Sequence, residues 1–168
     1  MKYVPAAVLA ACLSFPALTQ PVDDGLVGMT RAIGSAERTL SARAIEAELE
    51  TRKGRLVYEI DLVRSDTLHR ATVDARSGKL ITSEKPRFEN WLRAWIAKDR
   101  IRAGRAGEPL AGRLASLEKQ SRGEVKEVEF DMRGGKAVYE IEVATAAGIG
   151  EVHIDAATGK RLALAYDD

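Results

Sequence analysis

An internal repeat constrains the fold of this chain more than any other feature of its sequence. At an offset of 81 residues, short blocks return without a gap between them: VYEI at 57–60 and 138–141, DA at 74–75 and 155–156, and GK at 78–79 and 159–160. Weaker apolar matches extend the same register towards the N-terminal side of each copy. The repeat therefore spans a supersecondary unit of roughly 55 to 60 residues that occurs twice.

Each copy begins with helical periodicity and then changes to the period of a strand. Apolar residues recur at helical spacing over 26–40 and again over 110–117. In the second copy, Pro109 lies in the first helical turn and Gly123 stands where a C-terminal cap belongs. Apolar and acidic residues then alternate, which is typical of half-buried strands. We expect strands near residues 45–50, 55–63 and 68–75 in the first copy and near 127–132, 136–144 and 149–156 in the second.

The strands of each copy are expected to form an antiparallel meander, so the predicted fold is α+β, a helix followed by a three-stranded sheet, made twice. The residues expected on the buried face of the first strand are Ile45, Ala47 and Leu49. Glycines within 51–54 and 133–135 indicate hairpin turns. Gly78 and Gly159, in the repeated sequence D-A-x-[ST]-G-K, are expected at positive φ, which other residues adopt poorly.

The chain is expected to divide into a leader at 1–20, a first unit at 26–82, a connector at 83–106 and a second unit at 107–166. Apolar residues recur at helical spacing in the connector, which predicts an amphipathic helix with Trp91 and Trp95 on one face. Because a unit of about 60 residues is marginally stable alone, we expect the two units to pack together around these tryptophans. Contact of the basic connector with an anionic membrane surface is the less favoured alternative.

The leader predicts export. It contains one charge, Lys2, followed by an apolar stretch that falls short of the ~20 residues of a spanning helix. Cleavage near 17–20 would place the protein in the periplasm or outside the cell. The sequence LAAC at 9–12 resembles a lipobox, so a lipid anchor at Cys12 is the alternative. Without Lys2, the 26 basic and 25 acidic residues become equal in number, which gives no general attraction to nucleic acid.

Together these residues resemble the PepSY domain family. The resemblance lies in the striped helix, the Tyr-Glu pairs at 58–59 and 139–140 and the closing D-A-x-[ST]-G-K, and it covers about 26–82 and 107–164. It implies a small exported α+β module of the kind found in propeptides of some metallopeptidases and proposed to inhibit or regulate peptidases. It implies no catalytic residue. The residues expected to maintain the fold are Tyr58, Tyr139, Gly78 and Gly159, with Trp91 and Trp95 in the connector.

No motif of a zinc peptidase, a serine hydrolase or a P-loop enzyme occurs in the sequence, so we expect neither an enzyme nor a cofactor. The strand carboxylates are expected on a solvated face, where nothing would raise a pKa for acid or base catalysis. His69 shares the parity of the buried strand positions and is expected to point into the core. His153 has the opposite parity, beside Glu151 and Asp155, which leaves contact with a metal ion open.

Acidic residues recur at equivalent strand positions of both copies, and this recurrence suggests a basic partner. The residues assigned to partner binding are Glu46, Glu48, Glu50, Glu59, Glu127, Glu129, Asp131 and Glu140. An exposed sheet edge is a second surface that can accept a peptide strand. We interpret the chain as an exported, non-enzymatic module that regulates, inhibits or senses an envelope protein such as a peptidase. The alternatives are a structural or membrane-surface envelope protein and, less favoured, a cation-binding protein that uses the acidic faces.

Overall fold

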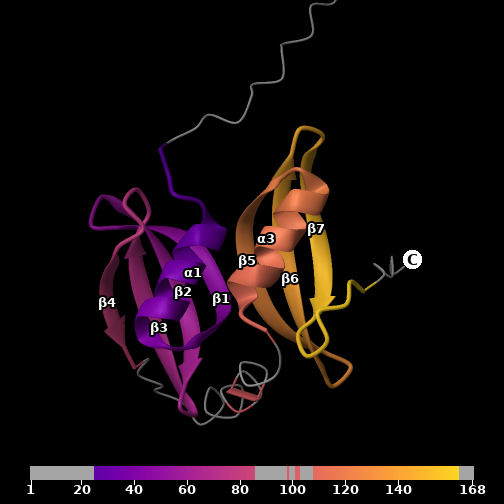
Figure 1. Cartoon of the computed structure of the whole chain (residues 1–168), viewed down its shortest axis with the longest axis horizontal. Coiled ribbons are helices and arrows are strands. Elements are labelled where there is room, and N and C mark those ends of the chain that lie inside the picture. The colour runs from indigo at the N-terminus through magenta and orange to yellow at the C-terminus, as the bar shows by residue number, and fades with distance from the viewer. Residues whose placement is uncertain (1–24, 86–97, 99–100, 103–107, 163–168) are drawn as a thin grey trace, which may run out of the picture.

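The structure is a computed structural model that describes residues 25–85, 98, 101–102 and 108–162. The expected leader and the connector tryptophans Trp91 and Trp95 lie outside the described residues. Neither labelled helix is long and apolar enough to cross a membrane. The elements in chain order (Figure 1) are α1 (Met29–Leu40), β1 (Arg43–Arg52), β2 (Arg55–Arg64), β3 (Thr67–Asp74), β4 (Leu80–Glu84), α3 (Leu110–Ser121), β5 (Glu124–Arg133), β6 (Lys136–Thr145) and β7 (Gly148–Asp155).

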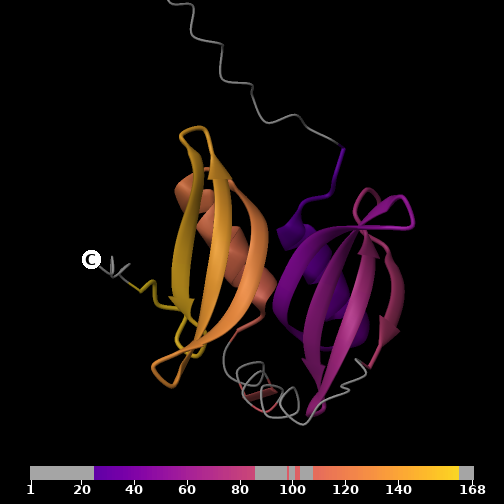
Figure 2. The same cartoon turned by 180° about the vertical axis from the view of Figure 1, so that it is seen from behind.

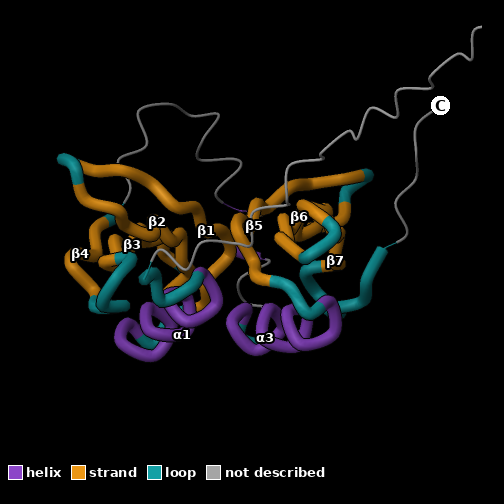
Figure 3. The backbone as a smooth tube through the Cα atoms, turned by 90° about the horizontal axis from the view of Figure 1, so that it is seen from above, coloured by secondary structure: helices purple, strands orange, loops and turns teal. Residues whose placement is uncertain are grey.

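The strands form one antiparallel sheet in the order β4-β3-β2-β1-β5-β6-β7. Both helices cover the same face of this sheet (Figure 3). The two units meet at β1 and β5, where Ala47 lies opposite Val128. The α+β prediction of a helix and an antiparallel sheet made twice is therefore confirmed, and the two sheets are halves of a single one.

One apolar cluster fills the space between the helices and the sheet, and it contains buried side chains of both units. Ile33 of α1 and Leu114 of α3 are fully buried in it. Tyr58 and Tyr139 also lie in this cluster, and burial raises the pKa of Tyr139 to about 12. A unit of about 60 residues buries too little apolar surface to be more than marginally stable alone, and the shared core increases the buried surface of both units.

The repeated sequence D-A-x-[ST]-G-K forms the same turn in both units. The carboxylate of Asp74 accepts the backbone N–H and the hydroxyl of Ser77, both at 2.8 Å. Gly78 then takes φ 68° and donates its N–H to the carbonyl of Asp74 at 2.8 Å. Asp155 and Gly159, at φ 72°, repeat this arrangement. The expectation of positive φ at both glycines is confirmed.

The first unit has a fourth strand that the periodicity did not predict. β4 pairs with β3, with Leu80 opposite Val73 and Glu84 opposite Arg70. It contains five residues, four of them exposed, so its sequence lacks the apolar alternation that announces a half-buried strand. Pairing with β3, rather than an apolar alternation of its own, makes this segment a strand.

A β-bulge between Ala44 and Glu46 overturns the expected facing of one residue. The extra residue shifts the alternation, so Ile45 leaves the side of Ala47 and packs with Val63 and Leu68 on the opposite face of the sheet. The prediction that Ile45 and Ala47 share a face was therefore wrong.

The end of α3 also differs from expectation. The residue in the left-handed conformation is Arg122, at φ 53°, and not Gly123. Gly123 has a different role, because a Cβ atom there would lie 2.6 Å from the carbonyl oxygen of Ala144. At the other end of the helix, Pro109 is the N-cap residue and precedes the first turn.

Candidate binding surface

Carboxylates gather on the face of the sheet that turns away from the helices. Figure 2 views the sheet from this side. Alternation places them there, because the neighbouring residues in each strand point into the core. We call this surface the acidic face. Its carboxylates are Glu46, Glu48, Glu50, Glu59, Asp61, Glu127, Glu129, Asp131, Glu140, Glu142 and Glu151. All eight residues assigned to partner binding therefore point to the same face of the sheet.

The acidic face continues across the junction of the two units. The pairing of Ala47 with Val128 brings Glu48 of β1 beside Glu127 of β5. Burial, and then the charge of Glu50, raise the pKa of Glu48, and the charge of Glu127 adds to this shift. Burial and the charges of neighbouring glutamates raise the pKa of Glu127 as well. The two acidic patches expected from the repeat thus form a single field of like charge.

Two arginines neutralise part of this field in the first unit. Arg70 of β3 donates two hydrogen bonds to Asp61, at 2.7 and 3.0 Å, and lies 3.4 Å from Glu59. Arg52 of β1 binds Glu59 and Glu50. Glu59 and Asp61 are only 3% and 5% exposed, so the expectation of a solvated position was wrong for both. Burial raises the pKa of Glu59 despite the opposing charge of Arg70.

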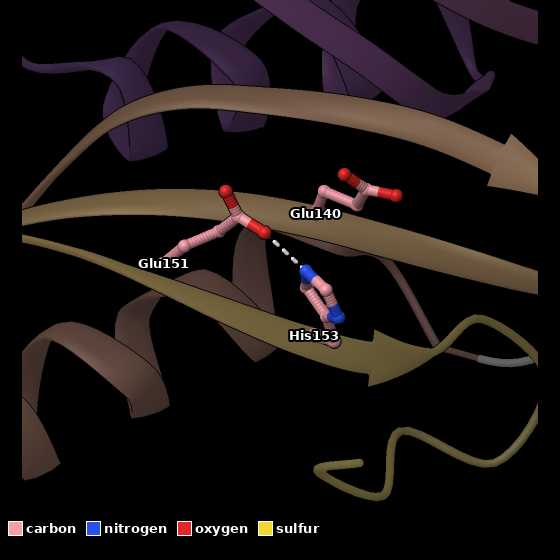
Figure 4. Close-up of side chains that lie close together, drawn as sticks. All are labelled: Glu140, Glu151 and His153. Carbon is pink, nitrogen blue, oxygen red and sulfur yellow. Dashed lines mark hydrogen bonds and ion pairs between the residues drawn. The ribbon is translucent and has the colours of Figure 1, made fainter. Parts of the chain in front are cut away.

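In the second unit, the corresponding cluster contains a histidine (Figure 4). Arg133 binds Glu140 at 2.6 Å and lies 3.3 Å from Nδ1 of His153. Because a guanidinium can only donate, Nδ1 accepts and Nε2 carries the proton that bonds Glu151. His153 is 6% exposed, so it is a buried residue and not a surface histidine.

The offset of 81 residues shows how the two halves of the acidic face differ. Arg52 corresponds to Arg133 and Glu59 to Glu140, but the place of Arg70 is taken by Glu151. The second unit therefore has a carboxylate where the first has an arginine that contacts two carboxylates. Its half of the face carries the larger unbalanced negative charge.

Two groups on the acidic face have a spacing that suits a metal ion. Donor atoms of Glu140, Glu151 and His153 lie within 4.8 Å of one another, and so do those of Glu48, Glu50 and Glu59. An arginine already contacts each group. A divalent cation would therefore compete with a guanidinium. Asp155, expected beside His153, instead holds the turn of the closing sequence.

Sequence reasoning missed Glu37, which joins the two units. This buried glutamate accepts the backbone N–H groups of Ala44 and Leu110, each at 3.1 Å. Its counterpart at the offset of 81, Glu118, accepts the N–H of Val125 at 3.0 Å. The repeat aligns Glu37 with Glu118, so it could have indicated the bond that each makes within its own unit. It could not have indicated the bond from Glu37 to Leu110 of the other unit.

A cleft of about 750 Å³ opens beside Glu37, where α1 approaches the start of α3. Its charged lining includes Arg38, Arg43, Arg64 and Asp66. This mixture of charges favours no particular ligand. The acidic face, where carboxylates outnumber arginines over several strands, is the stronger candidate for recognition.

Fold and surface together define a class: a duplicated helix-on-sheet module with a charged sheet face. The family model described as "Peptidase propeptide and YPEB domain" matches residues 30–84 and 115–163. The chain belongs to this PepSY family, as the sequence predicted. The first match extends from α1 to β4, and the second begins within α3 and continues through β7.

The chain also matches two solved structures. One is a candidate lipoprotein from Clostridium difficile 630, with 16% identity and a TM-score of 0.44 over 79% of this chain and 88% of that one. The other is the YpmB protein from Bacillus subtilis, with 17% identity and a TM-score of 0.34 over 82% and 95%. No curated protein matches the chain.

Proposed function

We propose that this protein is an exported, non-catalytic module that regulates or senses a partner protein in the cell envelope by holding a basic segment of it. The continuity of carboxylates across the junction of β1 and β5 is the observation that carries this proposal. Membership of a family named after peptidase propeptides supports a peptidase as the partner. The apolar leader at 1–20 supports export.

The electrostatics of the acidic face favour a cationic ligand. Glu127 lies directly opposite Glu142, and Glu48 lies beside Glu127 across the junction. Like charges at such positions destabilise a sheet by roughly 0.2–1 kcal/mol per pair. A lysine or arginine of a partner would relieve this repulsion, and the field would also steer its approach. The affinity should therefore fall as salt rises.

Charge reversal tests this proposal. The variants are Glu48→Lys and Glu127→Lys, one on each side of the junction, and the matched control is Glu108→Lys, an exposed carboxylate outside the sheet. Each protein is used to recover its partner from an envelope extract at low and high salt, and circular dichroism checks that it is folded. We expect the wild type and the control to recover the same partner at low salt, and the two variants to recover several-fold less.

Equal recovery of the partner by all four proteins would remove the acidic face from the mechanism. Hydrolysis of a peptide by the purified wild type would contradict the non-catalytic part of the proposal. These two results are independent, so each part of the proposal can fail alone.

Cation binding is a second candidate, favoured by the close spacing of Glu140, Glu151 and His153. Calorimetric titration with Zn²⁺ and with Mn²⁺ tests it. Saturation at one equivalent in the wild type and its loss in His153→Ala would support a metal site over a protein partner at this end of the sheet.

A further inference from the structure

The two units differ in what pairs with the third strand of each meander, β3 in the first unit and β7 in the second. In the first unit, β4 covers the outer side of β3, beginning with the pairing of Leu80 and Val73. The equivalent pairing in the second unit is the bridge between Arg161 and Ile154. From Gly148 to Val152, no described residue pairs with the outer side of β7. We call this side the β7 edge.

Backbone groups at the β7 edge are placed to bind another strand. The carbonyl of His153 accepts the N–H of Leu162 at 2.8 Å, which shows that His153 directs its backbone groups outwards. Because backbone direction alternates along a strand, Ile149 and Glu151 direct their N–H and C=O groups to the same side. The side chain of Ile149 is 72% exposed. Unpaired backbone groups beside an exposed apolar side chain are a template for strand addition.

In the first unit, the strand added to the meander places a residue of opposite charge across from an arginine. β4 places Glu84 directly opposite Arg70 of β3. In the second unit the residue equivalent to Arg70 is Glu151, so the charge on the receiving strand is inverted. A strand that fits the β7 edge as β4 fits β3 should therefore present a base opposite Glu151.

We infer that the β7 edge accepts an extended segment of the partner in antiparallel orientation, with Lys or Arg opposite Glu151 and an apolar residue opposite Ile149. The segment reads base, any residue, apolar residue from its N-terminal to its C-terminal side, because the strands run in opposite directions. This inference rests on the proposed function, since it names where and how the basic segment of the partner binds.

Two other occupants are less suitable on grounds of charge. The C-terminal residues 163–168, ALAYDD, contain no base to place opposite Glu151. A second copy paired edge to edge would bring the acidic β7 of one chain against that of another. A basic segment of a different protein would pair with the backbone of β7 and add an ion pair to Glu151, whose carboxylate already bonds His153.

The test uses a blocked octapeptide in which Arg-Thr-Val is flanked by threonines, and a matched peptide with Glu in place of Arg. Each is titrated into the ¹⁵N-labelled full chain, and the amide signals of Ile149 and Glu151 are followed. We expect the Arg peptide to shift and protect these amides, and the Glu peptide to bind about fivefold more weakly. N-methylation of the peptide's Arg and Val should abolish binding, because their N–H groups face β7. N-methylation of the intervening Thr should leave binding unchanged, because its N–H group points away from β7.

A charge swap provides the sharpest comparison. Glu151→Arg installs the residue that the first unit carries at the equivalent position, and it should reverse the preference so that the Glu peptide binds better. The control, Glu129→Arg, makes the same change at an exposed position of β5 on the same face. It should lower the affinity for the Arg peptide without reversing the preference.

Binding of the Arg peptide that survives both N-methylation and Glu151→Arg but is lost in Glu48→Lys would overturn the β7 edge and leave the proposed function standing. The same conclusion follows if neither peptide binds while the envelope partner is still recovered. Peptide binding only after removal of residues 163–168 would assign the edge to the chain's own C-terminal segment. A doubled mass in solution, with Ile149 and Glu151 protected before any peptide is added, would assign it to a second copy.

Discussion

The carboxylate of Glu37 accepts the backbone N–H of Leu110 across 73 positions of sequence, at 3.1 Å. A side chain of the first unit thus caps the first turn of α3, the helix of the second. Ala111 donates to the same carboxylate at 3.3 Å. Negative charge at a helix N-terminus is favourable because free N–H groups and the helix dipole both point at it.

Replacement of Glu37 should destabilise both units together. In Glu37→Ala the N–H groups of Ala44, Leu110 and Ala111 lose their acceptor, and we expect a loss of about 3 kcal/mol in the free energy of unfolding. Glu118→Ala, which removes one such bond, should cost about 1 kcal/mol. Urea denaturation followed by circular dichroism measures both. A Glu37→Ala protein as stable as the wild type would show that the cap does not join the units.

Two glycines of the second unit should respond in opposite directions to alanine. Gly123→Ala places a Cβ atom 2.6 Å from the carbonyl oxygen of Ala144, so β6 must move and stability should fall by at least about 2 kcal/mol. Gly112 lies within α3 with open space around it, and Gly112→Ala should gain about 0.5–1 kcal/mol from helix propensity alone. Thermal unfolding of the two variants distinguishes them. Equal shifts in Tm would contradict the close approach at Gly123.

Neutralising one carboxylate at the centre of the acidic face should stabilise the fold. The pKa of Glu48 is raised in the folded state, so folding is less favourable when this group is charged. The free energy of unfolding should therefore fall as pH rises from about 4.5 through the folded pKa of Glu48. Glu48→Gln should raise stability at pH 7 by about 0.5 kcal/mol and flatten this dependence. A free energy of unfolding that rises with pH over this range, or falls in Glu48→Gln, would mean that Glu48 has a stabilising partner.

The aspartates of the two repeated turns, Asp74 and Asp155, should make the free energy of unfolding rise with pH at lower pH. Hydrogen bonds from Ser77 lower the pKa of Asp74, and those from Thr158 lower the pKa of Asp155. A carboxylate with a lowered folded pKa stabilises the fold above its unfolded value near 3.8, and this contribution is lost as pH falls through the folded pKa. Asp74→Asn and Asp155→Asn should make stability less dependent on pH below about 4. Acid titrations at fixed urea concentration test this expectation, and an unchanged slope would refute it.

Local periodicity determined much of this structure in advance. Apolar spacing indicated both helices, and alternation with hairpin glycines indicated the six strands of the two meanders. The offset of 81 residues also predicted the two turns at Gly78 and Gly159 and the recurrence of acidic residues on one face. These features depend on neighbours within a few positions, so the order of residues is enough to determine them.

Tertiary structure decided which of those residues meet. The junction of β1 with β5 merged two acidic patches into one, and pairing with Arg70 allowed Glu59 and Asp61 to be buried. A bulge turned Ile45 to the other face, and Glu37 reached a helix far along the chain. Alternation along a strand indicates only which face of the sheet a side chain lies on. Burial, the pKa of a carboxylate and the charge opposite Glu151 depend on which strand lies beside it, and that is settled by long-range pairing.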